Sequence, residues 1–298
     1  MKKNAFFFLI LLLILFSSCF NISKAETILK KNQTFTTNKD LFKPFKSKNT
    51  NPNIQANIAS SVLLNNNNKI ILYEKNLNEK TSIASLSKLM TAIIVLDHYP
   101  LDSKILVDKE MMKVWGTSRN IQIGDYIEIK DLLYIMLLES NNDASECLSA
   151  KLNRSNFIIL MNEKAKQLKM KQTSFVNPSG LDEDNGTYNV SSAKDLTLLI
   201  YEIIGNYPEI VEILSKKEYD FINENGIIYK IKNTNIMLEE FSYKAWGKTG
   251  YTLSANECLI LMTKTPLNDT IINIVIKANN RFLEMRNLIT WVNNTFSF

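Results

Sequence analysis

A serine and a lysine three residues apart form the first pair in this sequence that could do covalent chemistry. Residues 83–92 read Ile-Ala-Ser-Leu-Ser-Lys-Leu-Met-Thr-Ala and contain Ser85 and Lys88. A helix that opens at Ser85 would place both side chains on one face, where the lysine can take the serine proton. The next residues, up to Leu96, are apolar nearly all round, which predicts a buried helix and a lowered lysine pKa. Alone, Ser-x-x-Lys is a weak signal, and its recurrence at 191–194 is interpreted as an ordinary helix start.

Two later segments add polar groups in a fixed order. Ser140-Asn141-Asn142 follows an amphipathic stretch at 131–138, and Lys248-Thr249-Gly250-Tyr251 follows about a hundred residues later. A second hydroxyl, an amide and a second ammonium can relay protons and bind a peptide substrate. The alternative for the middle segment is that Ser140 and Asn142 cap a helix beginning near residue 143.

Composition excludes several other chemistries. His98 is the single histidine, so a His-rich metal site cannot form and a Ser-His-Asp triad is disfavoured. Cys19, Cys147 and Cys258 lack metal-binding or disulfide spacing, and the latter two lie in apolar patterns that predict buried side chains. No metal or other cofactor is therefore expected. The formal charge of +5 is concentrated at the N-terminus, so we expect no nucleic-acid partner.

The N-terminus resembles an export signal. Two lysines precede an unbroken apolar run from Ala5 to Phe16, which is short for a membrane span but typical of a signal-peptide core. Cleavage after Ala25 fits a small-x-small pattern, whereas residues 16–19 resemble a lipoprotein box ending at Cys19. We predict a signal peptide at 1–25, a flexible spacer at 26–55 and a catalytic domain at 56–298, located in the periplasm or on the outer face of the cytoplasmic membrane. The N-terminus could then serve as a membrane tether.

The pattern of elements predicts an α/β fold. Residues 58–64 and 69–73 flank an asparagine run and predict a β-hairpin. Helical periodicity dominates from Ser85 to about Ile204, and strand patterns return at 255–263 and 270–277 before a last helix at 282–292. We therefore expect an antiparallel sheet assembled from both termini, flanked by helices, with a helical subdomain inserted between its strands.

Together, the three motifs resemble those of the serine β-lactamases and penicillin-binding proteins. From about residue 56 onward the chain is similar to the low-molecular-mass penicillin-binding proteins that are D-alanyl-D-alanine carboxypeptidases. The likeness includes residues 84–92, 132–144, Phe175 to Leu181, Asn233-Thr234-Asn235, residues 247–252, and Arg281-Phe282 ten residues before Trp291. Asn141 stands where these proteins usually have glycine, and Ser179 where histidine is common. The resemblance implies the β-lactamase/DD-peptidase fold, without the C-terminal stalk domain of larger members.

The resemblance also implies roles for the motif residues. Ser85 would attack the carbonyl between two D-alanines, and Lys88 would take its proton. Ser140 and Lys248 would relay protons, and Asn142 would hold a substrate amide. The backbone N–H groups of Ser85 and Tyr251 would form the oxyanion hole, and Lys248 and Gly250 would also belong to the substrate-binding residues. Thr249 and Arg281 would bind the substrate carboxylate, although Arg281 could instead be a surface residue at a helix start.

The expected partners are peptidoglycan peptides and β-lactam antibiotics, with roles in peptidoglycan biosynthesis and cell shape. Three rival functions remain. A D,D-endopeptidase of the same family would cut peptidoglycan cross-links. A β-lactamase would need a glutamate that activates the deacylating water, and residues 174–185 offer Asp182, Glu183 and Asp184 within a carboxypeptidase-like Asn-Pro-x-Gly-Leu pattern. A non-catalytic wall-binding protein would have no need for Ser85, Lys88 and Lys248. The bond cut in the cell, the oligomeric state and the β-lactam spectrum are left open.

Overall fold

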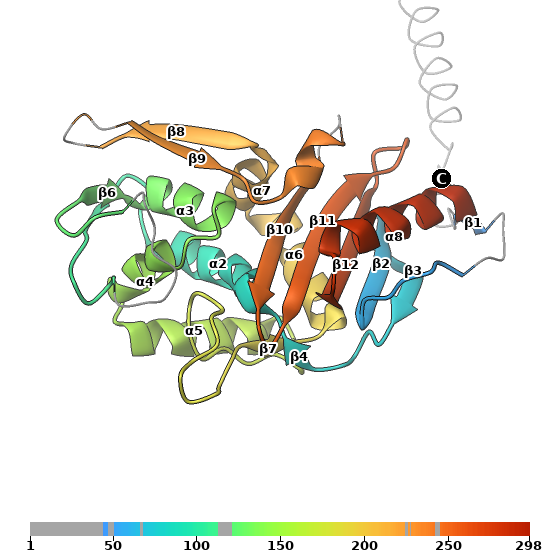
Figure 1. Cartoon of the computed structure of the whole chain (residues 1–298), viewed down its shortest axis with the longest axis horizontal. Coiled ribbons are helices and arrows are strands. Elements are labelled where there is room, and N and C mark those ends of the chain that lie inside the picture. The colour runs from blue at the N-terminus through green and yellow to red at the C-terminus, as the bar shows by residue number, and fades with distance from the viewer. Residues whose placement is uncertain are drawn as a thin grey trace, which may run out of the picture. The chain divides into compact units, whose positions relative to one another are not determined.

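Strands from both ends of the chain meet in one five-stranded antiparallel sheet (Figure 1). In spatial order these are β10 (Trp246–Thr252), β11 (Asn256–Lys264), β12 (Thr270–Ala278), β2 (Ile58–Asn65) and β3 (Asn68–Lys75). The computed structural model describes residues 44–46, 51–65, 68–112, 121–223, 226, 228–241 and 245–298. The sheet therefore confirms the predicted assembly of N- and C-terminal strands.

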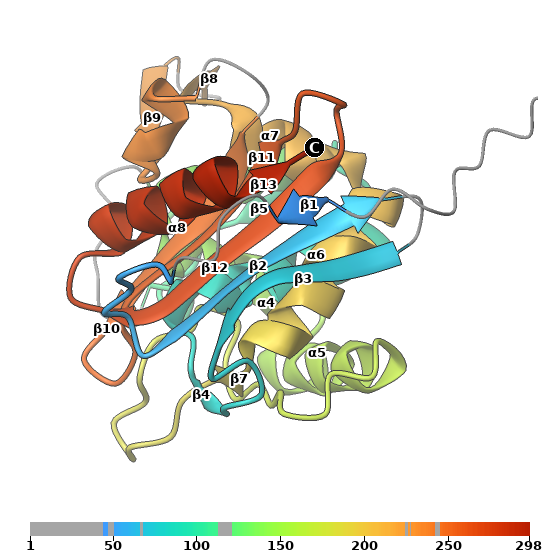
Figure 2. The same cartoon turned by 90° about the vertical axis from the view of Figure 1, so that its right-hand side faces the viewer.

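The two faces of the sheet contribute to two separate cores. Along β11, Leu259 and Leu261 pack with Met285 and Leu288 of α8 (Arg281–Thr295), because side chains alternate between faces. Ile260 points the other way, into a larger core built with the remaining helices. Figure 2 shows α8 on one side of the sheet and α6 on the other.

The helical region lies between β3 and β10 in sequence. Its α-helices are α2 (Lys88–His98), α3 (Ile129–Leu138), α4 (Asn142–Ala150), α5 (Arg154–Gln167), α6 (Ala193–Asn206) and α7 (Pro208–Ser215). The apolar helix α2 is buried from Lys88 to Val95, as its sequence predicts. Two small antiparallel pairs interrupt the helices: β4 (Thr81–Ser82) with β7 (Val190–Ser191), and β5 (Lys104–Leu106) with β6 (Tyr126–Glu128). Among the described helices, none has the length and apolar content that crossing a bilayer requires.

One hairpin was not predicted from the sequence. It pairs β8 (Glu218–Ile222) with β9 (Ile228–Lys232), and a short 3-10 turn at Ile236–Glu239 follows. A period of two was present, since Tyr219 and Phe221 are less exposed than their neighbours Glu218, Asp220 and Ile222. The Tyr219 ring stacks on Tyr134 of α3 at a centroid distance of 3.7 Å, which ties the hairpin to the helical region.

The folded unit begins earlier than the predicted boundary at residue 56. Residues 44–298 form one compact unit, in which β1 (Phe45–Lys46) pairs with β13 (Phe296–Ser297). Ile54 is 6% exposed in the core beneath α8, and the Gln55 N–H donates to Glu284 Oε2 at 2.7 Å. Residues 44–46 and 51–55 therefore belong to this compact unit, with Ile54 in the same core cluster as Met285 and Leu288 of α8. The predicted signal peptide and residues 26–43 of the predicted spacer lie outside the described residues.

Candidate active site

Ser85 and Lys88 are in direct contact. Ser85 lies in a 3-10 turn, Ala84–Ser87, and Lys88 begins α2. The α-helix therefore starts three residues later than predicted, but side chains at i and i+3 eclipse in a 3-10 turn and still share one face. The Lys88 Nζ lies 2.9 Å from the Ser85 Oγ.

Three oxygen atoms surround the Lys88 nitrogen. Besides the Ser85 Oγ, the Asn142 Oδ1 lies at 2.7 Å and the main-chain carbonyl of Ser179 at 2.6 Å. Carbonyl oxygens can only accept hydrogen bonds. A neutral amine would donate both of its N–H groups to them, and its lone pair would then face the Ser85 hydroxyl. This geometry orients a base toward a nucleophile.

Burial and charge both favour the neutral form of this lysine. The pKa of Lys88 lies well below its ordinary value, first because the group is buried and second because of the nearby Lys248 ammonium. Glu146 acts in the opposite direction and raises the Lys88 pKa. Burial, together with the charge of Arg281, lowers the pKa of Lys248 itself to about 7. Lys88 therefore meets the electrostatic requirement for a general base.

A cleft of about 430 Å³ opens in front of Ser85. The predicted residues Ser140, Asn142, Thr249, Gly250, Tyr251 and Arg281 all line it with Ser85. Lys248 is buried behind the cleft wall, and its Nζ donates to the Thr249 carbonyl at 3.0 Å. The structure thus brings the three sequence motifs to a single site.

The middle motif is not the helix cap that its sequence allowed. Asn141, not Ser140 or Asn142, is the N-cap of α4, and its Oδ1 accepts from the Ala144 N–H at 2.9 Å. The positive φ of this loop also falls on Ser140, at +63°, whereas Asn141 has φ −67°. Because Asn141 caps the helix, Ser140 and Asn142 line the cleft.

Strand β10 lies beside the nucleophile. A Cβ added to Gly250 would lie 3.2 Å from the Ser85 nitrogen, so the strand and the Ser85 turn are in close contact. Tyr251 is 57% exposed at the cleft, and the Thr249 hydroxyl lies 2.6 Å from the hydroxyl of Thr234. Thr249 is thereby held in place by a residue outside the three motifs.

Arg281 faces the cleft and is not a surface residue. It begins α8, its side chain is 17% exposed, and its Nη1 donates to the Gly250 carbonyl. Its main-chain N–H donates to Glu257 Oε2 at 2.8 Å. The guanidinium is therefore fixed beside β10 at one end of the cleft, where it can meet an anionic group.

Sequence reasoning assigned no role to three further lining residues, Leu181, Thr234 and Phe282. Each lies in a segment that resembles the family, and this resemblance is the feature of the sequence that could have identified them as site residues. Ser179 also had no role, and the structure shows that its main chain, not its side chain, contacts Lys88. A serine can therefore replace the histidine common at this position without removing that contact.

The remaining predicted residues have structural positions. Cys147 and Cys258 are buried, and burial raises the pKa of each thiol to about 12, which argues against a nucleophilic role. His98 ends α2, with its Nδ1 3.0 Å from the Ile94 carbonyl oxygen. Ser192 caps α6 through the Asp195 N–H, as expected for an ordinary helix start.

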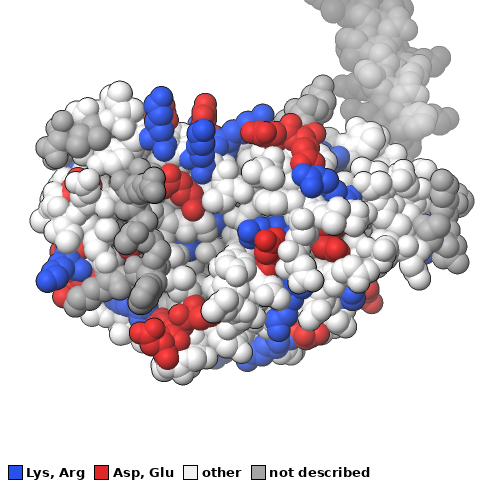
Figure 3. All heavy atoms as spheres, viewed as in Figure 1, with Lys and Arg blue, Asp and Glu red and all other residues white. Residues whose placement is uncertain are grey.

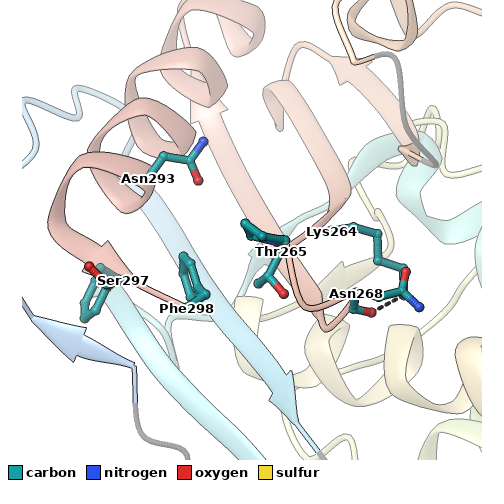
Figure 4. A pocket seen from close by; sticks show the side chains of 8 residues that line it. Lys264, Thr265, Asn268, Asn293, Ser297 and Phe298 are labelled. Carbon is teal, nitrogen blue, oxygen red and sulfur yellow. Dashed lines mark hydrogen bonds between the residues drawn. The ribbon is translucent and has the colours of Figure 1, made fainter.

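A larger hollow, of about 770 Å³, lies between the β11–β12 turn and the C-terminus, and no residue of the three motifs lines it (Figure 4). Lys264 is the one ionisable side chain in its lining, and its Nζ donates to the Asn268 carbonyl at 3.2 Å. The residues that line this hollow do not include a pair like Ser85 and Lys88, in which a nucleophile contacts a base. On the face drawn in Figure 3, acidic and basic side chains of the described residues are interspersed, and no continuous basic stripe is visible.

Comparison with known proteins agrees with this geometry. A family model described as D-alanyl-D-alanine carboxypeptidase matches residues 46–280. The D-alanyl-D-alanine endopeptidase of Escherichia coli K12 is 34% identical over 81% of this chain and 78% of its own length. The D-alanyl-D-alanine carboxypeptidase DacF of Bacillus subtilis 168 is 31% identical over 69% of this chain, which spans about half, 54%, of that relative.

A solved structure shares both the fold and much of the sequence. Penicillin-binding protein D2 from Listeria monocytogenes, in its cefotaxime-bound form, superposes with a TM-score of 0.70 at 33% identity. The match covers 82% of this chain and 100% of that one. The expected DD-peptidase-like fold is confirmed.

Proposed function

This chain belongs to the D-alanyl-D-alanine carboxypeptidase family, and on that premise we propose that it is a serine DD-peptidase acting through an acyl-enzyme on Ser85. Its substrates are the D-alanyl-D-alanine ends of peptidoglycan stem peptides, and it binds β-lactam antibiotics. The observation that carries the proposal is the contact of Ser85 with Lys88, whose other two acceptors are carbonyl oxygens.

The reaction begins when Ser85 attacks the carbonyl carbon of the scissile amide. The hydroxyl proton moves to the Lys88 nitrogen as the bond forms, and the carbonyl oxygen becomes an oxyanion. The backbone N–H groups of Ser85 and Tyr251 stabilise this oxyanion. The C–N bond then breaks, the leaving amine takes a proton relayed through Lys88 and Ser140, and water later hydrolyses the ester.

The other residues of the cleft bind the peptide. Asn142 contacts a substrate amide, although its Oδ1 also accepts from Lys88. Thr249 and Arg281 bind the carboxylate next to the scissile bond, because an arginine fork matches a carboxylate. Lys248 supplies positive potential from behind β10.

Labelling with a fluorescent penicillin tests this function. The wild-type protein should be tagged covalently, and Ser85→Ala should not. Ser87→Ala is the matched control, because Ser87 lies in the same 3-10 turn with its hydroxyl bonded to the Ala84 carbonyl at 2.8 Å. Tagging of a folded Ser85→Ala protein would refute the acyl-enzyme on Ser85.

D,D-endopeptidase activity is the second candidate. The E. coli relative named D-alanyl-D-alanine endopeptidase is 34% identical over 81% of this chain, which supports this candidate. Both reactions use the same acyl-enzyme and differ in the amine that leaves. Digestion of purified wall fragments separates them: a carboxypeptidase removes D-alanine from monomeric pentapeptides, and an endopeptidase converts cross-linked dimers to monomers.

The acidic loop residues do not favour a β-lactamase. Glu183 Oε1 accepts from Arg154 Nη2 at 3.1 Å and Asn177 Nδ2 at 2.9 Å, and Asp182 Oδ2 accepts from the Ser254 N–H at 3.1 Å. Neither of these two carboxylates lines the Ser85 cleft. We therefore expect slow hydrolysis of the penicilloyl ester, which would persist for many minutes after excess drug is removed.

We further propose that the protein is exported and acts outside the cytoplasm, where it contributes to wall maintenance and cell shape. Support comes from the lysine-flanked apolar run at 5–16. Mass spectrometry of the mature N-terminus distinguishes cleavage after Ala25 from a lipid-modified Cys19. A mature protein that retains residues 1–25 unmodified would contradict a cleaved signal, and a diacylglyceryl Cys19 would establish a membrane tether.

A further inference from the structure

One arginine links two helices to the loop that contacts the Lys88 amine. Arg154 begins α5, and its Nε donates to Glu146 Oε2 of α4 at 2.8 Å. Its Nη2 donates to Glu183 Oε1, in the loop after Asn177, at 3.1 Å. Glu146 lies one helical turn after the cleft residue Asn142. The guanidinium therefore bridges the helix of the middle motif and a loop of the cleft.

The bridge continues through the loop to Lys88. Glu183 Oε1 also accepts from Asn177 Nδ2 at 2.9 Å. The Asn177 Oδ1 accepts from the Gly180 N–H at 2.7 Å, which closes the turn containing Ser179. The Ser179 carbonyl then accepts from the Lys88 Nζ at 2.6 Å.

The helix end of the bridge is fixed by burial. The Glu146 side chain is 6% exposed, and its Oε1 is buried without a hydrogen-bond partner among the described residues. A buried carboxylate is costly unless a cation pairs with it, so Glu146 favours the contact with Arg154, whose own side chain is 46% exposed. The loop end is more open, with Glu183 34% exposed.

We propose that Arg154 is a positioning residue for acylation: with Glu146 and Glu183 it holds the 177–183 loop so that the Ser179 carbonyl stays against Lys88. This inference rests on the proposed function of the Ser85–Lys88 pair. Without that carbonyl, one N–H of Lys88 loses its acceptor and the amine can rotate its lone pair away from Ser85. Displacement of a catalytic group by about 1 Å can reduce a rate by roughly 100-fold.

The test compares Arg154→Met with Lys164→Met. Lys164 lies on the same helix and pairs with Asp97 Oδ2 at 3.0 Å, away from the loop. Stopped-flow measurement of penicillin acylation from pH 5 to 10 gives both a rate constant and a tagged fraction. We expect Arg154→Met to lose roughly 10- to 100-fold in rate constant, and the loss should persist on the high-pH plateau, where Lys88 is neutral. Lys164→Met should keep the wild-type rate constant.

The two readouts separate positioning from stability. A purely structural ion pair would lower the tagged fraction by unfolding some molecules, but it would leave the rate constant of the folded molecules unchanged. If Arg154→Met does not fold, Glu183→Ala replaces it, since this more exposed partner leaves the Glu146–Arg154 pair intact; a several-fold slower rate is expected.

Each outcome has a distinct meaning. A wild-type rate constant in folded Arg154→Met, or in Glu183→Ala where that variant replaces it, would overturn the positioning role alone. Failure of the wild-type protein to be tagged at all would instead overturn the proposed function on which the inference rests.

Discussion

Gly180 lies directly against Ala84, the residue before the nucleophile. A Cβ on Gly180 would lie 2.0 Å from the Ala84 carbonyl oxygen, and Gly180 has φ +85°, a conformation that side chains disfavour. The loop that contacts Lys88 and the turn that holds Ser85 are therefore packed backbone to backbone. Glycine is required at this position for both reasons.

The first prediction is that Gly180→Ala slows acylation. The added methyl group must push the loop away from the Ser85 turn, and overpacking of this kind typically costs about 1–3 kcal/mol. We expect a lower unfolding temperature and a penicillin acylation rate reduced at least several-fold. Gly186→Ala is the matched control, because Gly186 also has positive φ, at +78°, but nothing lies within 4 Å of its added Cβ. Equal acylation rates in the two variants would show that the close contact has no catalytic importance.

The second prediction concerns the protonation of Lys88. Lys88→Ala should lose acylation at every accessible pH, because no base remains beside Ser85. Lys88→Arg should do little better, since an arginine cannot release its proton near neutrality. Acylation rates between pH 5 and 10, measured on protein shown to be folded by circular dichroism, check both expectations. A near-normal rate in the arginine variant would mean that another group takes the serine proton.

The sequence alone predicted contacts between residues that are close together along the chain better than contacts between distant ones. Ser85 and Lys88 are three residues apart, so helical spacing predicted their contact even though the turn is 3-10. The hairpin of β2 and β3 was also predicted, because its two strands are adjacent in sequence. The grouping of the three motifs was inferred from their order and family likeness, since no local pattern specifies which segments meet.

Contacts set by loop conformation were beyond such reasoning. Thr234 meets Thr249 fifteen residues away, and Arg154 meets Glu183 across twenty-nine. The sequence allowed Ser140 or Asn142 to cap a helix, whereas Asn141 is the N-cap of α4 and Ser140 adopts the positive φ of this loop. These contacts depend on the backbone conformation of loops, which sets the direction of their side chains. The periodicity of apolar residues does not predict that conformation.

The third prediction is a rise in stability with pH that depends on Lys248. Its pKa is about 7 in the folded protein, against roughly 10.4 for an unperturbed lysine. Between these values the unfolded chain binds more protons than the folded one, so the free energy of unfolding increases as pH rises from 7 toward 10. The contribution of Lys248 is therefore lost progressively as pH falls from about 10 toward the folded pKa of about 7.

Urea denaturation at pH 7.0, 8.0 and 9.0 checks this behaviour. Lys248→Met should show a shallower rise, with some slope remaining because the Lys88 pKa is lowered as well. Lys230→Met, at an exposed position in β9, is the control and should keep the wild-type slope. If the wild-type stability fell across this range, the lowered pKa of Lys248 in the folded protein would be incorrect.

The last prediction concerns Arg281, whose guanidinium stands at the end of the cleft beside the Gly250 carbonyl. In both candidate reactions the amine that leaves belongs to a D-configured amino acid. The free carboxylate of that amino acid lies next to the scissile amide. A charge-assisted contact to that carboxylate is worth about 1.5–3 kcal/mol. Arg281→Ala should therefore lose roughly 10- to 150-fold in kcat/KM for peptides. Stability should fall by about 1 kcal/mol, because the hydrogen bond to Gly250 is lost as well.

A substrate with an amidated terminal carboxylate separates recognition from general damage. The wild-type enzyme should lose most of its rate on the amide, whereas Arg281→Ala should barely distinguish amide from acid. Arg286→Ala is the matched control, since this α8 residue pairs with Glu240 away from the cleft lining and should keep the wild-type preference. If Arg281→Ala still prefers the free acid as strongly as wild type, the carboxylate is bound by another group, and Thr249 and Lys248 are then the residues to replace next.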